Sequence, residues 1–293
     1  MSEQSVYQRL RGHLAYLRLT AAAEALAPEL DRAAQEKLSH SAFLDRLLGV
    51  EVEATEARRL SGRQRFACLP APWRLEDIDF DAQPKLDRRL IEELATLRFI
   101  EEAANVLLIG PPGVGKTMIS VALGHRAVEA GYRVYYTTAS DLAAHCQRAA
   151  IQGKWATTMR FYAQPSLLIV DELGYLPLAG EAASALFQVV SRRYLKSSIC
   201  LTTNRGVAQW AEIFNDDSMV AAAMLDRLLH RATVIHIDGE SYRMRTHRAA
   251  AERLRTALAV QTDRPPADGS RNRAAVRAQE VRNRSDAIHN TYT

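Results

Sequence analysis

The segment GPPGVGKT, at residues 110–117, restricts the possible folds of this chain more than any other feature. It matches the pattern G-x-x-x-x-G-K-S/T at every fixed position, and the apolar run VLLIG at residues 106–110 leads into it. Glycine lets backbone N–H groups come close to a phosphate chain, and the helix expected after the loop directs its positive end toward that anion. A strand, a glycine loop and a helix in this order predict a P-loop protein that binds ATP.

Each polar residue of this loop has an expected role toward the nucleotide. Lys116 is expected to be a solvated point charge on the β and γ phosphates, and the Thr117 hydroxyl is expected to ligate Mg²⁺. A glycine turn without a ligand is the alternative, and the flanking strand and helix argue against it. The expected nucleotide-binding residues are Gly110, Pro111, Pro112, Gly113, Val114, Gly115, Lys116, Thr117 and Met118.

A pair of acids completes the expected site. Asp171 and Glu172 stand at the end of the apolar run LLIVDE at residues 167–172, and ligands bind at the carboxyl ends of strands in parallel sheets. We expect Asp171 to hold Mg²⁺ through water and Glu172 to orient or deprotonate the attacking water. The two adjacent acids favour hydrolysis of ATP over simple binding.

Two further residues are candidates for the reaction. Asn204 ends the next expected strand, where its side chain would position the lytic water or sense the γ-phosphate. Capping a turn is the alternative for Asn204, and Thr202 or Thr203 are alternatives to it in the site. Arg227 precedes the last expected strand and would complete the site of a neighbouring subunit by stabilising transition-state charge. From its spacing alone, a surface ion pair explains Arg227 better.

Strands and helices are expected to alternate after residue 105. Continuous apolar strands separated by helices predict an α/β fold with a parallel sheet flanked by helices on both faces. Asp141 is expected to cap one helix, and a single helix is expected at residues 86–100. The expected strands are 106–110, 133–139, 166–171, 198–204 and 233–238.

A small all-helical domain is expected to precede this α/β domain. One helix would contain Leu10 and Ala21, and a second would be capped by Ser41 and end in a basic stretch. Pro70 and Pro72 mark a linker. The expected division is a helical DNA- or partner-binding domain at 1–66, a linker at 67–84, an ATPase domain at 85–250 and a basic, disordered tail at 251–293.

Composition and charge limit the kinds of partner that this chain is expected to bind. Hydrophobic residues make up 47% of the chain and charged residues 25%, which is usual for a globular protein, and no apolar stretch is long enough to cross a membrane. With no signal peptide and with three cysteines expected to be buried, reduced thiols, a cytoplasmic location is expected. The net charge of +4 indicates an affinity for nucleic acid, or only a solvated surface. The candidate DNA-binding residues are Arg58, Arg59, Arg63 and Arg65.

Longer segments of the chain resemble one known family, the IstB-like ATP-binding proteins, which are AAA+ ATPases close to the DnaC-type helicase loaders. The likeness covers roughly residues 5–250 and extends outside the ATP motifs. The matching segments are YLRLTAAAEAL, SHSAFLDRLLGVEVEATEARR, LPAPWRLEDIDF, LIGPPGVGKT, LLIVDELGYLPL, LTTNR and DRLLHRATVIHIDGESYR.

The resemblance implies a AAA+ ATPase that uses ATP and Mg²⁺, assembles as a ring or helical filament on duplex DNA, and assists a transposase in target selection. It also implies that Arg227 is an arginine finger and that Arg243 senses the nucleotide. A replicative helicase loader is the alternative, but Cys68 is the only cysteine before the ATPase domain, whereas such loaders often carry a cysteine-rich metal site. A small-molecule kinase lacks support because no basic lid is evident, and the two acids argue against a scaffold without hydrolysis.

Overall fold

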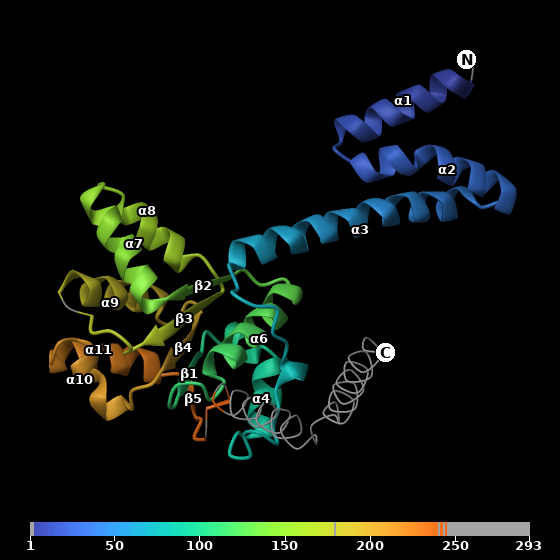
Figure 1. Cartoon of the computed structure of the whole chain (residues 1–293). Helices are drawn as coiled ribbons and strands as arrows, with labels where there is room; N and C mark the ends of the chain where they lie inside the picture. The colour runs from blue at the N-terminus through green and yellow to red at the C-terminus, as the bar shows by residue number, and fades with distance from the viewer. Residues whose placement is uncertain (1–2, 179, 240, 243, 245–293) are drawn as a thin grey trace, which may run out of the picture. The chain divides into compact units, whose positions relative to one another are not determined.

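The computed structural model describes residues 3–178, 180–239, 241–242 and 244, and a five-stranded sheet lies at its centre (Figure 1). The strand order is β2-β3-β4-β1-β5, and every pairing is parallel. The carboxyl ends of all strands therefore meet at one edge of the sheet. The strands are β1 (Asn105–Ile109), β2 (Val134–Thr138), β3 (Leu167–Leu173), β4 (Ser198–Thr203) and β5 (Ala232–His236).

Helices cover both faces of the sheet, and each face has its own core. Leu107 belongs to the core on one face, whereas its neighbours Val106 and Leu108 belong to the core on the other. Because both faces are buried, the strands have continuous apolar sequences. One core takes residues from α4 (Arg88–Ala95), α5 (Arg98–Glu101) and α6 (Lys116–Glu129), and the other from α7 (Ala139–Ile151), α8 (Trp155–Ala163), α9 (Glu181–Arg193), α10 (Trp210–Ile213) and α11 (Ser218–Leu229).

Three helices precede this domain, α1 (Glu3–Tyr16), α2 (Thr20–Glu36) and α3 (His40–Ala67), and a 3-10 turn η1 (Leu75–Asp77) follows them. Ala22, Leu26 and Leu47 form a small separate core between α2 and α3. The C-terminal end of α3 contacts α6 and β2. The predicted fold class is confirmed: helices at the N-terminus precede an α/β domain with a phosphate loop and a parallel sheet flanked by helices. A second 3-10 turn, η2 (Val207–Gln209), follows β4.

The predicted N-terminal helices differ from the observed ones at their ends. The helix expected to contain Leu10 and Ala21 is two helices, because Arg18 has a φ of 61° and the chain reverses there. The reversal lets residues of α1 and α2 share one small core. The N-cap of α3 is Ser39, not Ser41, since the Ser39 side chain accepts a hydrogen bond from the Ala42 N–H at 3.2 Å.

The α/β domain also differs from the sequence-based predictions at three helices. The N-cap of α7 is Thr138, not Asp141, because the Thr138 backbone is extended at the end of β2 and its hydroxyl accepts a hydrogen bond from the Asp141 N–H at 3.0 Å. The helix expected at 86–100 is broken at Leu97, which has a φ of 64° and a buried side chain. Helix α8 was not expected, because its threonine and aromatic residues have low helix propensity; burial of Met159 stabilises it.

The remaining predictions concern the cysteines, membrane-spanning helices and the C-terminal tail. Cys146 and Cys200 are buried as expected, whereas Cys68 is exposed, which corrects the expectation of three buried thiols. Within the described ranges, no helix combines the length and the apolar character that crossing a membrane requires. The predicted disordered tail at 251–293 lies outside the described residues.

Candidate nucleotide-binding site

The phosphate loop follows β1 directly and is shaped by its glycines. Gly113 and Gly115 have φ values of 84° and 101°, a conformation that residues with side chains rarely adopt. Gly110 is required for a different reason, because a Cβ there would lie 2.1 Å from the backbone oxygen of Ile237. The loop therefore needs glycine at each of these positions of the sequence motif.

Lys116 is held inside this loop rather than in solvent. Its side chain is buried, and its Nζ donates hydrogen bonds of 2.8 Å to the carbonyl oxygens of Gly110 and Pro111. The expectation of a solvated charge was wrong, because the loop folds around its own lysine. The ammonium group is positioned at the centre of the loop, where phosphate oxygens would replace the two carbonyl partners.

Asp171 is the most constrained carboxylate of the site. Its exposed fraction is 1%, and its oxygens accept hydrogen bonds from three hydroxyl groups. Thr117 donates at 3.1 Å, Tyr136 donates at 2.7 Å, and Thr202 donates through a short bond. These donors come from α6, β2 and β4, so neighbouring elements on three sides fix the carboxylate at the carboxyl edge of the sheet.

Burial and the hydrogen bond to Asp171 raise the pKa of Tyr136 far above its usual value. The phenol therefore stays protonated and remains a hydrogen-bond donor to the carboxylate. Neither Tyr136 nor the donor role of Thr202 was among the expected site residues, although Thr202 was named as an alternative to Asn204. The sequence signal that locates Tyr136 is weak: it lies two residues before the end of a strand that is adjacent to β3 only in the folded chain.

The oxygen atoms of Thr117 and Asp171 are suitable ligands for Mg²⁺. Thr117 and Asp171 offer oxygen ligands within hydrogen-bonding distance of each other, and Mg²⁺ in P-loop sites takes few protein oxygens, keeps water and binds substrate phosphates. No group of three or more His, Cys, Asp or Glu side chains that could hold a metal is found among the described residues. Thr117 and Asp171 therefore fit Mg²⁺ that also binds nucleotide phosphates.

Glu172 lies on an irregular part of β3. The register between β3 and β4 shifts between Val170 and Leu173, and Glu172 has a φ of 62°. Its N–H donates to the Thr202 hydroxyl at 3.0 Å, which stabilises this conformation, and its side chain is exposed. Bulges of this kind redirect side chains next to active sites. Here the bulge places a buried acid and an exposed acid side by side.

Asn204 follows β4 at the same edge of the sheet. Its Oδ1 atom is buried and has no hydrogen-bond partner within the described part of the chain. The turn after β4 is capped instead by Thr203, whose hydroxyl accepts the Arg205 N–H at 3.1 Å. A buried acceptor without a donor is costly, so the Asn204 amide is suited to a water or ligand that brings one.

The segment after β5 lies against the phosphate loop. The Ile237 N–H donates to Ile109 at 2.8 Å, and the Tyr242 N–H donates to the Gly113 carbonyl at 3.0 Å. A Cβ at Gly113 would lie 2.1 Å from the Ser241 hydroxyl oxygen. Sequence reasoning did not identify this contact. Arg243, the expected nucleotide-sensing residue, lies outside the described residues.

Arg227, on α11, does not contact the phosphate loop of its own chain in the described structure. Its Nη1 donates to the Ala223 carbonyl at 2.9 Å, and its guanidinium lies 4.6 Å from the centre of the Phe187 ring. The described residues include no acid paired with it, so the surface ion pair considered from the sequence is not formed there.

The four candidate DNA-binding arginines of α3 differ in their contacts. Arg58 bonds to Glu51 at 2.6 Å, Arg59 bonds to Glu56 at 2.9 Å, and Arg63 donates to the Val128 carbonyl at 3.2 Å. Arg65 is exposed, and its side chain has no hydrogen bond or ion pair with the described residues. Three of the four arginines are therefore engaged within the protein.

Comparisons with known proteins agree with the site. The family model described as IstB-like ATP binding protein matches residues 12–250. A protein of Geobacillus stearothermophilus, named for ATP binding and for insertion sequence IS5376, is 40% identical over 246 residues, which cover 84% of this chain and 98% of that protein. A similarly named protein of insertion sequence IS21 from Pseudomonas aeruginosa is 41% identical over 234 residues, 80% of this chain and 88% of its own. Among solved structures, AMPPCP-bound DnaA from Aquifex aeolicus is similar with a TM-score of 0.49 and 20% identity, over 58% of this chain and 51% of that one.

Proposed function

Because this chain belongs to the family of IstB-like ATP binding proteins, we propose that it is a AAA+ ATPase that assembles on duplex DNA and assists the transposase of an insertion sequence in target selection. The observation that supports hydrolysis most directly is the position of Asp171, buried between Thr117, Tyr136 and Thr202 and followed by the exposed Glu172. The relatives named for insertion sequences favour a role in transposition over helicase loading.

In this proposal the phosphate loop binds the ATP phosphates through its backbone N–H groups and Lys116. The lysine exchanges its hydrogen bonds to Gly110 and Pro111 for bonds to the β and γ phosphates. Thr117 and Asp171 would hold Mg²⁺, for which the Thr117 hydroxyl would give up its bond to Asp171. Mg²⁺ bound there would supply positive charge to offset the negative charge of the phosphates.

Water activation falls to Glu172 and Asn204. Glu172 is exposed at the carboxyl edge of the sheet, where its carboxylate accepts a proton from the attacking water. The buried Oδ1 of Asn204, which has no partner in the described structure, accepts a second hydrogen bond from the same water and orients it. In this proposal Asp171 is the metal-binding acid and Glu172 is the general base.

Assembly completes the site in this proposal. Arg227 of one subunit reaches the γ-phosphate bound by the next, since among the described residues its guanidinium contacts one carbonyl and one aromatic ring and no acid. Contacts that repeat head to tail form a closed ring or an open helical filament, and either can surround a duplex. The residues at 1–66 contact DNA or the partner, and 67–84 link them to the ATPase domain at 85–250. Of the candidate arginines of α3, Arg65, whose side chain is exposed, contributes to DNA binding.

The test separates hydrolysis from binding with Glu172→Gln. The variant keeps the buried metal-binding group, so it should bind ATP and DNA as the wild type does, while its turnover falls by roughly 10² to 10⁴-fold because the base is lost. Phosphate release and DNA-binding anisotropy with ATP and Mg²⁺ measure both properties. The control is Glu181→Gln, which neutralises an exposed acid on α9 and should behave as the wild type. Wild-type turnover by Glu172→Gln would show that this residue is not the base.

A further inference from the structure

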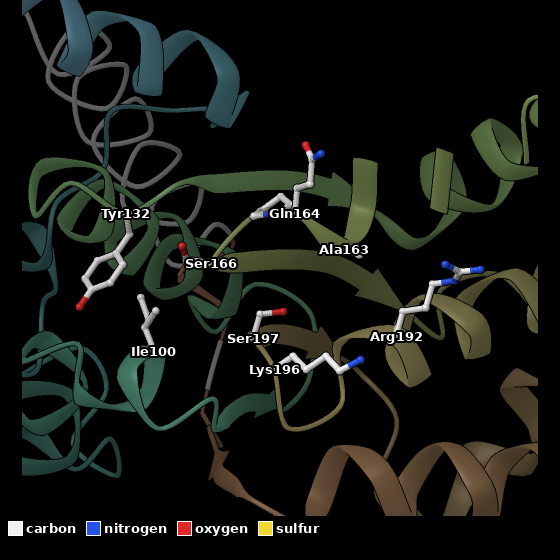
Figure 2. Close-up of a pocket in the computed structure, with 9 residues that line it drawn as sticks. Ile100, Tyr132, Ala163, Gln164, Ser166, Arg192, Lys196 and Ser197 are labelled. Carbon is white, nitrogen blue, oxygen red and sulfur yellow. The ribbon is translucent and has the colours of Figure 1, made fainter. Parts of the chain in front are cut away.

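A pocket of about 490 Å³ lies at the amino-terminal edge of the sheet, at the opposite end of the strands from the phosphate loop. Most of its lining residues come from the segments before β2, β3 and β4 and from the ends of α8 and α9, and Ile100 of α5 completes the lining (Figure 2). None of its lining residues is an acid. The polar lining residues are Tyr132, Gln164, Ser166, Arg192, Lys196 and Ser197.

Two exposed cations border this pocket without a counter-charge. Arg192 and Lys196 form no ion pair with the described residues, and Figure 2 shows Lys196 beside Ser197 near the middle of the view, with Arg192 to their right. The Ser197 hydroxyl is buried and has no hydrogen-bond partner in the described structure. Tyr132, on the other side of the view, already donates its hydroxyl to Glu101 at 3.1 Å. The Ser197 hydroxyl, which can still form a hydrogen bond, therefore lies on the part of the pocket that carries the positive charge of Lys196.

A third cation lies buried behind the pocket. Arg193 has an exposed fraction of 1% and donates only to carbonyl oxygens, those of Tyr162 at 2.8 Å, Ser198 at 2.6 Å and Ser166 at 3.4 Å. Its Nε has no partner in the described structure. Burial lowers the pKa of Arg193 to about 9, so the guanidinium is still charged at neutral pH. A buried cation without an anion is costly, and an anion in the adjacent pocket would offset that cost.

We propose that this pocket binds a backbone phosphate of duplex DNA through Arg192, Lys196 and the Ser197 hydroxyl, with Arg193 as a buried positive charge behind it. The lining matches the side chains that contact DNA phosphates, which are arginine, lysine, serine, glutamine and tyrosine. Exposed cations at the rim suit a polymer that passes across the surface. The inference rests on the DNA binding proposed above, and it places phosphate contacts where the cations are not paired, unlike Arg58, Arg59 and Arg63.

The experiment measures how DNA affinity depends on salt in the full-length protein. The variant Arg192→Gln/Lys196→Gln removes two phosphate contacts, so the slope of log affinity against log salt, followed from about 50 to about 200 mM, should become shallower by about 2. A labelled duplex of mixed sequence, ATP and Mg²⁺ are present throughout. The matched control is Arg148→Gln/Lys154→Gln, which removes the same charge from exposed residues outside the pocket and should leave the slope nearer the wild-type value.

A second variant excludes a purely structural effect. Ser197→Ala removes a hydroxyl that has no partner in the described structure, so the folded protein should melt at or above the wild-type temperature while DNA affinity falls several-fold. Unchanged slope and affinity in both pocket variants, with normal DNA binding by the wild type, would overturn the phosphate pocket alone. Failure of the wild type to bind DNA would refute the proposed function and this inference together. Equal losses in the pocket and control variants would show a general charge effect and also overturn the pocket.

Discussion

Asp171 is the residue around which the candidate site is organised. The polar oxygens of a carboxylate that is 1% exposed need hydrogen-bond donors within the protein, and Thr117, Tyr136 and Thr202 supply them. If Thr117 turns toward the metal ion when the nucleotide binds, Tyr136 and Thr202 still hold the carboxylate in place. We therefore infer that Tyr136 positions a metal-binding acid without touching the substrate.

This role predicts a specific effect of Tyr136→Phe. Loss of the 2.7 Å hydrogen bond should reduce turnover and raise the half-saturating Mg²⁺ concentration, each by about 10- to 100-fold, as for other residues that support metal ligands. Binding of ATP without Mg²⁺ should be unchanged, because the phosphate loop is intact. Titration of ATPase activity with Mg²⁺ at saturating ATP makes the measurement.

Tyr135→Phe is the matched control for this prediction. Tyr135 precedes Tyr136 on β2 and packs its ring 4.8 Å from that of Phe161, in the core on the other face of the sheet. Its replacement removes a phenol hydroxyl from the same strand without touching Asp171. If both variants shift the Mg²⁺ dependence equally, or neither does, Tyr136 has no positioning role.

Helix α3 connects two packed regions through its arginines. Arg58, near its middle, bonds to Glu51, whose carboxylate also accepts the Ala22 N–H at 3.0 Å. Arg63, one turn further on, donates to the Val128 carbonyl in the last turn of α6, where a cation interacts favourably with the negative end of the helix dipole. From the sequence alone, the four arginines of α3 form one basic patch. Their contacts in the structure differ, so we expect them to differ in function.

The division predicts opposite effects for two variants of α3. Arg63→Met keeps the apolar stem and removes the donor, so it should lower stability by about 1 kcal/mol, or ~2–4 °C in melting temperature, with little change in DNA affinity. Arg65→Met should leave the melting temperature unchanged and make the salt dependence of DNA binding shallower by about 1. Thermal unfolding and DNA-binding anisotropy test the pair. The reverse pattern would show that Arg63, not Arg65, contacts DNA.

At the scale of the whole molecule, the proposed site is incomplete within one chain. The phosphate loop, Asp171 and Glu172 meet at one edge of the sheet, whereas Arg227 contacts Ala223 and Phe187 instead. Hydrolysis would then require two subunits, and turnover per subunit should rise with protein concentration. The proposed assembly on DNA thereby becomes a condition for catalysis.

Mixing two inactive variants tests the shared site. Lys116→Met chains cannot bind ATP but can donate Arg227, and Arg227→Ala chains can bind ATP but cannot complete a neighbour. In a random equal mixture, about a quarter of the head-to-tail interfaces combine both intact groups, so turnover should recover to about that fraction of wild type. Phosphate release is measured for each variant and for the mixture.

The control for the mixture is Arg148→Ala, which replaces an exposed arginine on α7. This variant should be active when it is assayed alone, without a second variant. Co-precipitation of tagged and untagged chains establishes that mixed assemblies form. If mixed assemblies form and recover no turnover, Arg227 does not act on the neighbouring site.

The sequence by itself determined the parts of this protein that depend on consecutive residues. The phosphate loop was predictable because its glycines, Lys116 and Thr117 act through the backbone between one strand and one helix. The parallel sheet was predictable because strands buried on both faces are apolar throughout. The edge at which Asp171, Glu172 and Asn204 meet followed from the parallel direction of the strands.

Only the tertiary structure decided which distant residues meet at that edge and elsewhere. Tyr136 reaches Asp171 because β2 lies beside β3 in a particular register, and strand order and register are not written in any local pattern. The same holds for Arg63, which caps a helix 65 residues away in the chain, and for Arg193, whose burial leaves a positive charge behind a pocket. The sequence around a basic residue does not show whether its charge is paired. The tertiary packing determines which groups lie next to the residue, and these neighbours decide whether its charge is available to a ligand.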